Sequence, residues 1–266
     1  MRRSMLFIPG NTPNLLMNGD VLGADSIILD LEDAVSPAEK DSARILVRNA
    51  LKNLHYQGCE IIIRINPVET DYWTHDLDEI IPLKPNMIMP PKVSCAQDVK
   101  TVSEYIGKLE EKCGFEKNTV KLIPLIETAM GVENAFQIAS ADERVAALFL
   151  GGEDLTADLR CKRTKEGNDV YDTPFTDVDD IEGLYTDARF AKSLGFSGKA
   201  SISPRHVEGI NEVFSPTQAE IDYAHEVMET IRIAKQQGKG VVSLHGKMID
   251  APIVERARQV IEMEKA

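Results

Sequence analysis

The sequence contains few cysteines, and their spacing matches no common metal or disulfide framework. The four, Cys59, Cys95, Cys113 and Cys161, form no CxxC pair and no zinc-ligand spacing. We therefore expect reduced, mostly structural thiols, and nothing in the cysteine pattern supports a zinc protein.

Long hydrophobic runs are also missing. No apolar stretch reaches the length that a membrane-spanning helix needs. The start of the chain has two basic residues followed by apolar ones, but the apolar part is too short for a signal peptide and runs into Pro9-Gly10 without a cleavage pattern. We interpret this start as a first strand and expect a cytoplasmic protein.

Positive charge is scarce, since 30 Lys and Arg residues face 43 Asp and Glu residues and the formal net charge is −13. This balance argues against binding to nucleic acid or to an anionic membrane. Basic residues gather at Arg2 and Arg3 and again at Lys40, Arg44 and Arg48, which share one helix face because they are spaced by four. That face is either a solvated surface or a site for an anionic group such as a nucleotide-bearing thioester.

The 266 residues, 43% of them apolar, are enough for one large domain or a domain with an appendage. Apolar runs typical of buried parallel strands occur at 5–9, 26–31, 60–66, 87–91, 121–127, 146–151, 171–176 and 199–203. Helical stretches fall between them, at 12–18, 38–53, 96–112, 130–139 and 181–193. This order predicts a (β/α)₈ barrel of the TIM type. An open doubly wound sheet is the runner-up, but no Gly-rich dinucleotide motif follows the first strand.

The segment 155–171 departs from this pattern. It is polar and charged, and no amphipathic helix fits it, although a parallel crossover needs one. Roughly fifteen to twenty residues, a mean helix plus part of a strand, are missing there. We therefore predict that Val170 and Tyr171 are not consecutive in the native gene product. Otherwise the barrel itself is damaged.

The chain changes character after Ser203. Residues 215–218 (SPTQ) form a capping-box start, and the helix that follows closes at Gly238. A short strand at 241–244 and a last helix at 251–264 complete the chain. We predict a barrel over 1–214 and a helical extension over 215–266. The extension has too little apolar surface to stand alone and should pack on the barrel or on a neighbouring subunit.

Acidic residues end the apolar strands. Glu127 and Asp154 follow two of them, and a third runs into Glu32 and Asp33. Carboxylates at the carboxyl ends of parallel strands meet at one face, and oxygen ligands with open positions suit Mg²⁺. Glu127 could instead be a surface acid, and Asp154 or Asp33 a helix cap.

Seven short blocks, taken together and in order, resemble the signature of one family. They are residues 2–10 (RRSMLFIPG), 29–35 (LDLEDAV), 63–66 (IRIN), 91–92 (PK), 126–128 (IET), 152–155 (GEDL) and 246–250 (GKMID). The chain thereby resembles the citrate lyase beta subunits, the CitE-like branch of the HpcH/HpaI aldolase superfamily. Residues 241–248 (VVSLHGKM) resemble these subunits more than the related malyl- and citramalyl-thioester lyases.

The resemblance implies a Mg-dependent lyase that splits a citryl thioester into oxaloacetate and an acetyl thioester. It implies that Glu127 and Asp154 bind Mg²⁺, or Mn²⁺ in its place, and that Glu32 and Asp33 support the metal's water shell. Asp250 becomes the candidate catalytic acid or base, although an Asp before Ala251-Pro252 is also an ordinary helix cap.

Basic residues in the same blocks become candidates for substrate binding. Arg64 follows three isoleucines, and a buried guanidinium there suits a substrate carboxylate or a developing oxyanion, or else pairs with the site's own acids. Lys92 either balances charge or contacts substrate. The resemblance also assigns Gly152, Glu153 and Arg3 to substrate binding.

The resemblance further implies assembly and leaves alternatives open. The thioester rides on coenzyme A or on an acyl carrier protein, the C-terminal extension acts as a lid, and partners include further copies in a trimer or hexamer and possibly the citrate lyase alpha subunit. A citramalyl- or malyl-CoA lyase and an impaired barrel kept for complex assembly are the alternatives. Ile202-Ser203-Pro204 departs from the family's usual His or Asn, and a serine cannot titrate near neutral pH.

Overall fold

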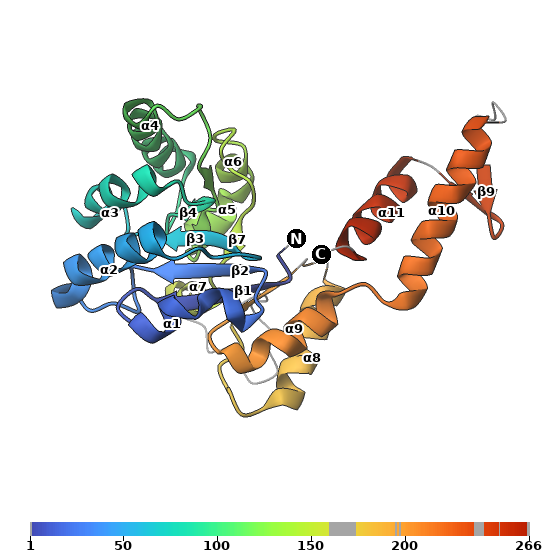
Figure 1. Ribbon diagram of the computed structural model, residues 1–266, viewed down its shortest axis with the longest axis horizontal. Coiled ribbons are helices and arrows are strands. Elements are labelled where there is room, and N and C mark those ends of the chain that lie inside the picture. Colours follow the sequence, from blue (N-terminus) through green and yellow to red (C-terminus); the bar gives the residue numbers. More distant parts are fainter. Residues whose placement is uncertain are drawn as a thin grey trace. The chain divides into compact units, whose positions relative to one another are not determined.

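The computed structural model describes residues 2–159, 174–194, 196, 198–236, 242–249 and 251–264. The chain forms two compact units, Arg2–Val213 and Phe214–Ala266. Figure 1 shows the strands of the larger unit surrounded by helices, and the smaller unit built mainly from two helices. Within the described residues, no helix combines the length and the apolar character needed to cross a membrane.

Parallel strands form the centre of the larger unit. A six-stranded sheet has the spatial order β5-β4-β3-β2-β1-β8. Its strands are β1 (Ser4–Pro9), β2 (Ser26–Asp30), β3 (Glu60–Arg64), β4 (Met87–Met89), β5 (Lys121–Leu122) and β8 (Lys199–Ser201). All their pairings are parallel.

A second parallel pair, β6 (Leu125–Ile126) and β7 (Phe149–Leu150), continues this sheet. Pro124 interrupts the regular ladder, but Ile123 and Leu125 still donate backbone hydrogen bonds to the carbonyls of Ile88 and Pro90, at 3.0 Å each. The strands therefore follow one another from β8 to β7. Residues 160–173, which lie between these two strands in sequence, are outside the described part.

Helices alternate with these strands. They are α1 (Pro13–Met17), α2 (Lys40–Asn53), α3 (Tyr72–Ile80), α4 (Ala96–Cys113), α5 (Ala129–Glu133), α6 (Ala135–Ala139), α7 (Gly152–Asp158), α8 (Ile181–Ser193) and α9 (Pro204–Phe214), with 3₁₀ turns η1 (Gly19–Leu22), η2 (Pro37–Glu39) and η3 (Ile81–Leu83). The predicted α/β class with a parallel sheet is confirmed.

Several elements differ from the sequence-based expectations. The strand expected over 171–176 is not formed at 174–176, and 171–173 lie outside the described residues. No helix was expected at α3, α7 or α9. A helix of seven residues such as α7 is too short to show a helical period in sequence. The helix expected over 130–139 is two short helices, α5 and α6, separated at Asn134.

The core lies on both faces of the sheet. All five residues of β2 are buried. Ile27 and Leu29 belong to the cluster that packs under the helices, whereas Ile28 belongs to a second cluster with Ile62 and Met87. This alternation follows from the two-residue period of a strand, and burial on both faces is typical of a parallel sheet in an α/β protein.

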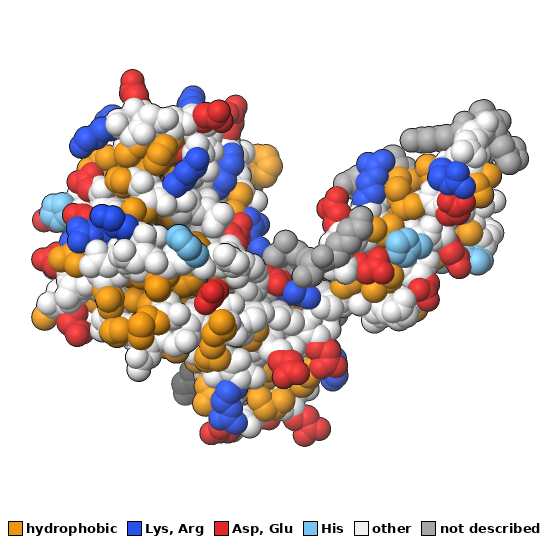
Figure 2. All heavy atoms as spheres, in the orientation of Figure 1, with side chains coloured by type: hydrophobic (Ala, Val, Ile, Leu, Met, Phe, Trp, Pro, Cys, Tyr) orange, Lys and Arg blue, Asp and Glu red, His pale blue; other side chains and the backbone are white. Residues whose placement is uncertain are grey.

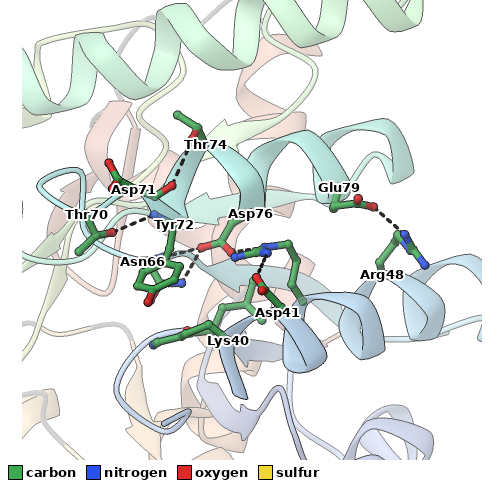
Figure 3. A network of polar contacts seen from close by, with 12 residues as sticks. Lys40, Asp41, Arg48, Asn66, Thr70, Asp71, Tyr72, Thr74, Asp76 and Glu79 are labelled. Carbon is green, nitrogen blue, oxygen red and sulfur yellow. Dashed lines mark hydrogen bonds and ion pairs between the residues drawn. The ribbon is translucent and has the colours of Figure 1, made fainter. Parts of the chain in front are cut away.

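The basic side chains of α2 are used within the fold (Figure 3). Lys40 is buried, and its Nζ donates to the backbone carbonyls of Leu31 and Glu32 at 2.8 and 2.7 Å. Arg44 is also buried and donates from Nε to Asp76 at 2.8 Å. Of the two alternatives for this helix face, the solvated surface is therefore wrong for these two residues, because both are buried and hold the larger unit's loops and helices.

Asp76 of α3 is the centre of that network. Its Oδ2 accepts hydrogen bonds from the backbone N–H and the side-chain amide of Asn66, at 2.9 and 2.7 Å. Arg48, farther along α2, pairs with Glu79 at 2.8 Å. Figure 2 shows basic and acidic side chains interspersed over the visible face of this unit. Lys40, Arg44 and Arg48 thus all have partners within the larger unit.

The smaller unit contains α10 (Gln218–Gln236), the antiparallel hairpin of β9 (Val242–Leu244) and β10 (Lys247–Ile249), and α11 (Ala251–Glu264). Its core includes Ala224, Val227, Ile249 and Ala257. The N-terminal capping box of α10 is formed by residues 217 and 220, two positions after the predicted start, where Thr217 N–H donates to Glu220 at 2.7 Å. The predicted end at residue 238 lies outside the described residues.

Candidate active site

A cavity of about 300 Å³ opens at the carboxyl edge of the larger unit's strands. Asp30 ends β2, Glu127 follows β6 directly, and Asp154 lies in the first turn of α7, just after β7. All three line the cavity together with Asp33 and Arg64. The structure therefore brings Glu127 and Asp154 together, as expected for side chains at neighbouring carboxyl ends of parallel strands.

Glu127 is a buried carboxylate, and only one hydrogen bond to it is found among the described residues. Its side chain is 3% exposed, and its Oε1 accepts a hydrogen bond of 2.7 Å from the backbone N–H of Lys92. Burial foremost, and then the negative charges of Glu32 and Asp154, raise the pKa of Glu127 to about 8, although the Lys92 hydrogen bond opposes the shift. The charge of Arg64 also opposes the shift, and an additional positive charge such as a metal ion would favour the charged form of Glu127.

Lys92 connects two acids of the site. Its backbone N–H binds Glu127, and its Nζ lies 3.0 Å from Oε1 of Glu32. The residue has a φ of +54°, in the left-handed region that a side chain other than glycine rarely adopts. Burial acts to lower the pKa of Lys92, but the contact with Glu32 and the surrounding acids raise it overall. These contacts support the charge-balancing interpretation of Lys92.

Arg64 is held by the site's own acids. Its Nε and Nη2 donate to the two oxygens of Asp30 at 2.7 and 2.6 Å, and its Nη1 lies 2.9 Å from Glu32. The guanidinium also lies over the ring of Phe7, 5.0 Å from the centroid. Burial acts to lower the pKa of Arg64, but Asp30 and the neighbouring carboxylates outweigh it and raise the pKa. Arg64 is thus a fixed cation in the cavity wall.

Asp30 is the residue that the sequence reasoning missed. It is buried and also accepts backbone hydrogen bonds from Glu32 and Ala34, at 2.9 and 3.2 Å. The sequence did contain a signal, because Asp30 and Arg64 each end an apolar strand and are direct partners in the register of β2 and β3. Opposite charges at matching ends of neighbouring strands predict a pair.

Glu32 and Asp33 occupy different environments. Glu32 is 2% exposed, and its burial raises its pKa even though Arg64 opposes the shift. Asp33 is exposed at the cavity, 3.9 Å from Lys92. Both lie beside the predicted metal ligands, where carboxylates could orient bound water.

The cavity has the properties of a site for a hard divalent cation. Among the described residues around it, five carboxylates meet two cations, Arg64 and Lys92, so negative charge is in excess. No group of three or more His, Cys, Asp or Glu side chains arranged for a metal occurs in the described part of the chain. Two protein carboxylates with further positions for water or substrate suit Mg²⁺ rather than a closed zinc site.

The remaining predicted residues are distributed differently. Gly152 lines the cavity at the start of α7, and Glu153 follows it in that helix. Arg3 lies at the opposite, amino end of β1 and pairs with Asp25 at 2.7 Å, so the structure does not bring it to the cavity. Asp250 lies outside the described residues. Ile202 lines the cavity and directly precedes Ser203, the residue that differs from the family's usual His or Asn.

The fold and the site define a parallel α/β protein with a paired-carboxylate cavity of the kind that holds Mg²⁺ at the carboxyl ends of strands. A family model described as HpcH/HpaI aldolase/citrate lyase matches residues 3–174, and the chain belongs to this family. The family predicted from the seven blocks is therefore confirmed.

The relatives include citrate lyase beta subunits. That of Leuconostoc mesenteroides subsp. cremoris is 38% identical over 284 aligned positions, covering 100% of this chain and 94% of the relative. That of Escherichia coli K12 is 36% identical, covering 98% and 92%. An L-malyl-CoA/beta-methylmalyl-CoA lyase of Cereibacter sphaeroides is 29% identical, covering 97% and 93%. The predicted enzyme class, a carbon–carbon lyase, agrees with these relatives.

Solved structures show the same fold. The CitE protein of Mycobacterium tuberculosis in complex with magnesium, acetoacetate and coenzyme A has a TM-score of 0.73 and 26% identity, and the match covers 100% of this chain and 98% of that one. A citrate lyase beta subunit complexed with oxaloacetate and magnesium, from the same organism, has a TM-score of 0.67 and 27% identity, covering 81% and 97%.

Proposed function

We propose that this chain is a Mg²⁺-dependent lyase that cleaves a citryl thioester to oxaloacetate and an acetyl thioester. The observation that most directly supports this is the pair Glu127 and Asp154 in one cavity with excess negative charge. The citryl substrate is favoured over malyl because the citrate lyase beta subunits are 36–38% identical to this chain and the malyl-CoA/beta-methylmalyl-CoA lyase is 29% identical.

Glu127 and Asp154 would hold the metal, with Mn²⁺ able to replace Mg²⁺. When bound, the ion would supply Lewis acidity that lowers the pKa of the substrate hydroxyl and stabilises the keto oxygen formed from it. Lys92 keeps Glu127 in place through its N–H hydrogen bond. Glu32 and Asp33 are placed to orient water beside the ligands.

Arg64 supplies fixed positive charge on the cavity wall. Because Asp30 and Glu32 hold its guanidinium from two sides, it needs no reorganisation when negative charge develops on the substrate. The rings of Phe7 and Phe149, 6.0 Å apart, line the same cavity and limit the access of water.

Asp250 is the proposed proton donor to the acetyl enolate carbon as the carbon–carbon bond breaks, and the proton that the substrate hydroxyl loses would return the Asp250 carboxylate to its protonated form. This role comes from the family resemblance of residues 246–250. Substrate-binding roles for Gly152, Glu153 and Lys92 have the same basis. Coenzyme A or an acyl carrier protein as the thioester carrier, a homo-oligomer and an alpha subunit as partner remain proposals of the same kind.

Calorimetry on two variants tests the assignment of the metal site. Glu127→Ala and Asp154→Ala should each abolish calorimetric Mg²⁺ binding while the circular dichroism of the fold is unchanged. Glu229→Gln, an exposed acid of α10, serves as the control and should bind Mg²⁺ normally. Unchanged Mg²⁺ affinity in both cavity variants would refute the assignment of the metal site.

Assays with citryl-, citramalyl- and malyl-coenzyme A identify the substrate. We expect the highest kcat/KM with the citryl thioester and loss of turnover after chelation. A preference for the malyl or citramalyl substrate would replace the proposal with the corresponding lyase. Turnover of none of the three, together with absent Mg²⁺ binding, would support the impaired barrel retained for complex assembly.

A further inference from the structure

Gly151 separates β7 from α7 and lies against the side chain of Glu127. Its backbone N–H donates to the carbonyl of Ile126 at 2.8 Å, which fixes it beside the strand that precedes Glu127. Its φ and ψ are −99° and 93°, an extended conformation that any amino acid can adopt. The backbone therefore gives no reason for a glycine at this position.

The reason lies in the space above its Cα. A Cβ atom at position 151 would lie 2.8 Å from Oε2 of Glu127, 3.0 Å from the Cβ of Glu127 and 3.0 Å from Cδ1 of Leu125. The first separation is shorter than carbon–oxygen contacts that side chains tolerate, so the carboxylate would have to move. Interiors are packed closely enough that even one added methyl group is felt.

The two oxygens of Glu127 are consequently fixed in different ways. Oε1 accepts the hydrogen bond of Lys92, whose left-handed backbone aims its N–H at the carboxylate. Oε2 lies over the bare Cα of Gly151, and among the described residues no hydrogen bond ends on it. A hydrogen bond thus holds one oxygen of the carboxylate, whereas the other has open space beside it at the wall of the cavity.

We propose that Gly151 is a positioning residue, whose missing side chain lets Glu127 present Oε2 to the cavity as a metal ligand. This inference rests on the proposed Mg²⁺ site. It predicts that a single methyl group at position 151 damages the metal site through Glu127, although position 151 itself touches no metal.

The first test is Mg²⁺ binding by calorimetry on the full chain carrying Gly151→Ala. The dissociation constant should rise by about 10–100-fold, the usual effect of disturbing a group that orients a metal ligand. Gly107→Ala in α4 is the matched control, because a Cβ there meets its nearest atom at 3.6 Å, an ordinary contact, and alanine favours a helix. An affinity of Gly151→Ala equal to that of Gly107→Ala would refute the inference.

The second test is a double-mutant cycle on thermal melting without metal. Gly151→Ala should lower the melting temperature by at least about 2–4 °C. In the Glu127→Ala background, where the carboxylate is absent, the same methyl group should cost distinctly less. An equal loss in both backgrounds would show that the methyl group acts on Leu125 or on the Cβ of residue 127, which alanine retains, rather than on the carboxylate, and would overturn the inference.

The cycle also separates this inference from the proposed function. If Glu127→Ala retains full Mg²⁺ affinity, the proposed metal role fails, whereas the melting cycle still reports whether Gly151 shapes the pose of Glu127. If Glu127→Ala loses Mg²⁺ but Gly151→Ala binds it normally, the proposed function stands and the role of Gly151 is wrong.

Discussion

At the scale of single residues, the site is a set of charges fixed by neighbours before any ligand arrives. Asp30 and Glu32 hold Arg64, and Lys92 holds both Glu127 and Glu32. Because these contacts are made within the protein, the cavity presents oriented groups with little reorganisation. The cost is a buried carboxylate, Glu127, whose pKa is raised to about 8.

The proton donor is tested by Asp250→Asn. Asparagine caps a helix about as well as aspartate, so the start of α11 should keep its stability. If Asp250 is the acid, turnover should fall by roughly 10²–10⁴-fold while Mg²⁺ and thioester binding are retained. Steady-state kinetics with calorimetry on the same preparation measures both. A turnover close to that of the unchanged protein would reduce Asp250 to a helix cap.

An experiment with hybrid oligomers tests whether Asp250 acts in the active site of a neighbouring subunit. Mixing Asp250→Asn with Glu127→Ala chains should restore part of the activity if one subunit supplies the acid and another the metal ligand. Mixtures with no more activity than either variant alone would place both groups in the same chain.

At the scale of elements, buried ion pairs hold the strands and helices in register away from the cavity. Arg144, just before β7, donates to both oxygens of Glu110 in α4, at 2.9 and 2.6 Å, and both side chains are 1% exposed. Glu110 also accepts the backbone N–H groups of Asn118 and Val120, ahead of β5. One carboxylate thus joins α4 to the start of two strands.

This pair makes stability depend on pH in a defined direction. Burial acts to raise the pKa of Glu110, but the hydrogen bonds from Arg144 and from the backbone outweigh it and hold the pKa below its usual value. A group with a lowered folded-state pKa stabilises the protein above its unfolded-state pKa, near 4.5. That contribution is lost as the pH falls through the folded-state value.

The variant Glu110→Gln should therefore lower the free energy of unfolding by about 3–5 kcal/mol at pH 7, the cost of leaving a buried charge unpaired. The difference from the unchanged protein should narrow as the pH falls from 4.5 to the lower folded-state pKa of Glu110, because protonation of Glu110 then favours the unfolded chain. Urea unfolding across this pH range measures it. Glu111→Gln, an exposed neighbour on α4, should show little effect. A constant difference at all pH values would contradict the prediction.

The sequence predicted the strong elements and missed the weak ones for identifiable reasons. The strand β2 was predicted to within one residue and α8 over its whole length, because long apolar runs and helical periods are local signals. The helix α7 was missed because seven residues cannot show a period. The burial of Lys40 and Arg44 was missed because their partners, the Leu31 carbonyl and Asp76, come from other elements.

The candidate site divides in the same way. Glu127 and Asp154 could be placed in one cavity from sequence because parallel strands bring their carboxyl ends together. Arg3 was assigned to substrate by resemblance, but it directly precedes β1 and therefore lies at the other end of that strand. The role of Gly151 could not be predicted, since it depends on a contact between elements: a Cβ atom at position 151 would lie only 2.8 Å from Oε2 of Glu127.

At the scale of the whole molecule, the chain has two compact units that differ in how they are stabilised. The larger unit has extensive apolar clusters on both faces of a sheet. The smaller unit has a small core between two helices and a hairpin. A unit of that size has little apolar area to bury, so we expect it to depend on further contacts in an assembly.

The final prediction concerns the length of the chain between β7 and the strand expected at 171–176, ahead of α8. A parallel crossover requires a helix or an equivalent connection of a dozen or more residues, and the sequence over 155–171 shows no amphipathic helix. The alignment with the Leuconostoc citrate lyase beta subunit spans 284 positions, although this chain has 266 residues, so the relative contains positions that this chain lacks. We therefore expect the natural protein to contain roughly fifteen to twenty additional residues at this place.

Mass spectrometry of the natural protein measures this. Its intact mass should exceed 29.5 kDa, and proteolytic peptides spanning residues 155–176 should be heavier than this sequence allows. Peptides covering 121–150 and 177–205 should match the sequence and serve as internal controls. Peptides that join Val170 directly to Tyr171 would establish that the shortened connection is real, and the predicted barrel would then need a different closure.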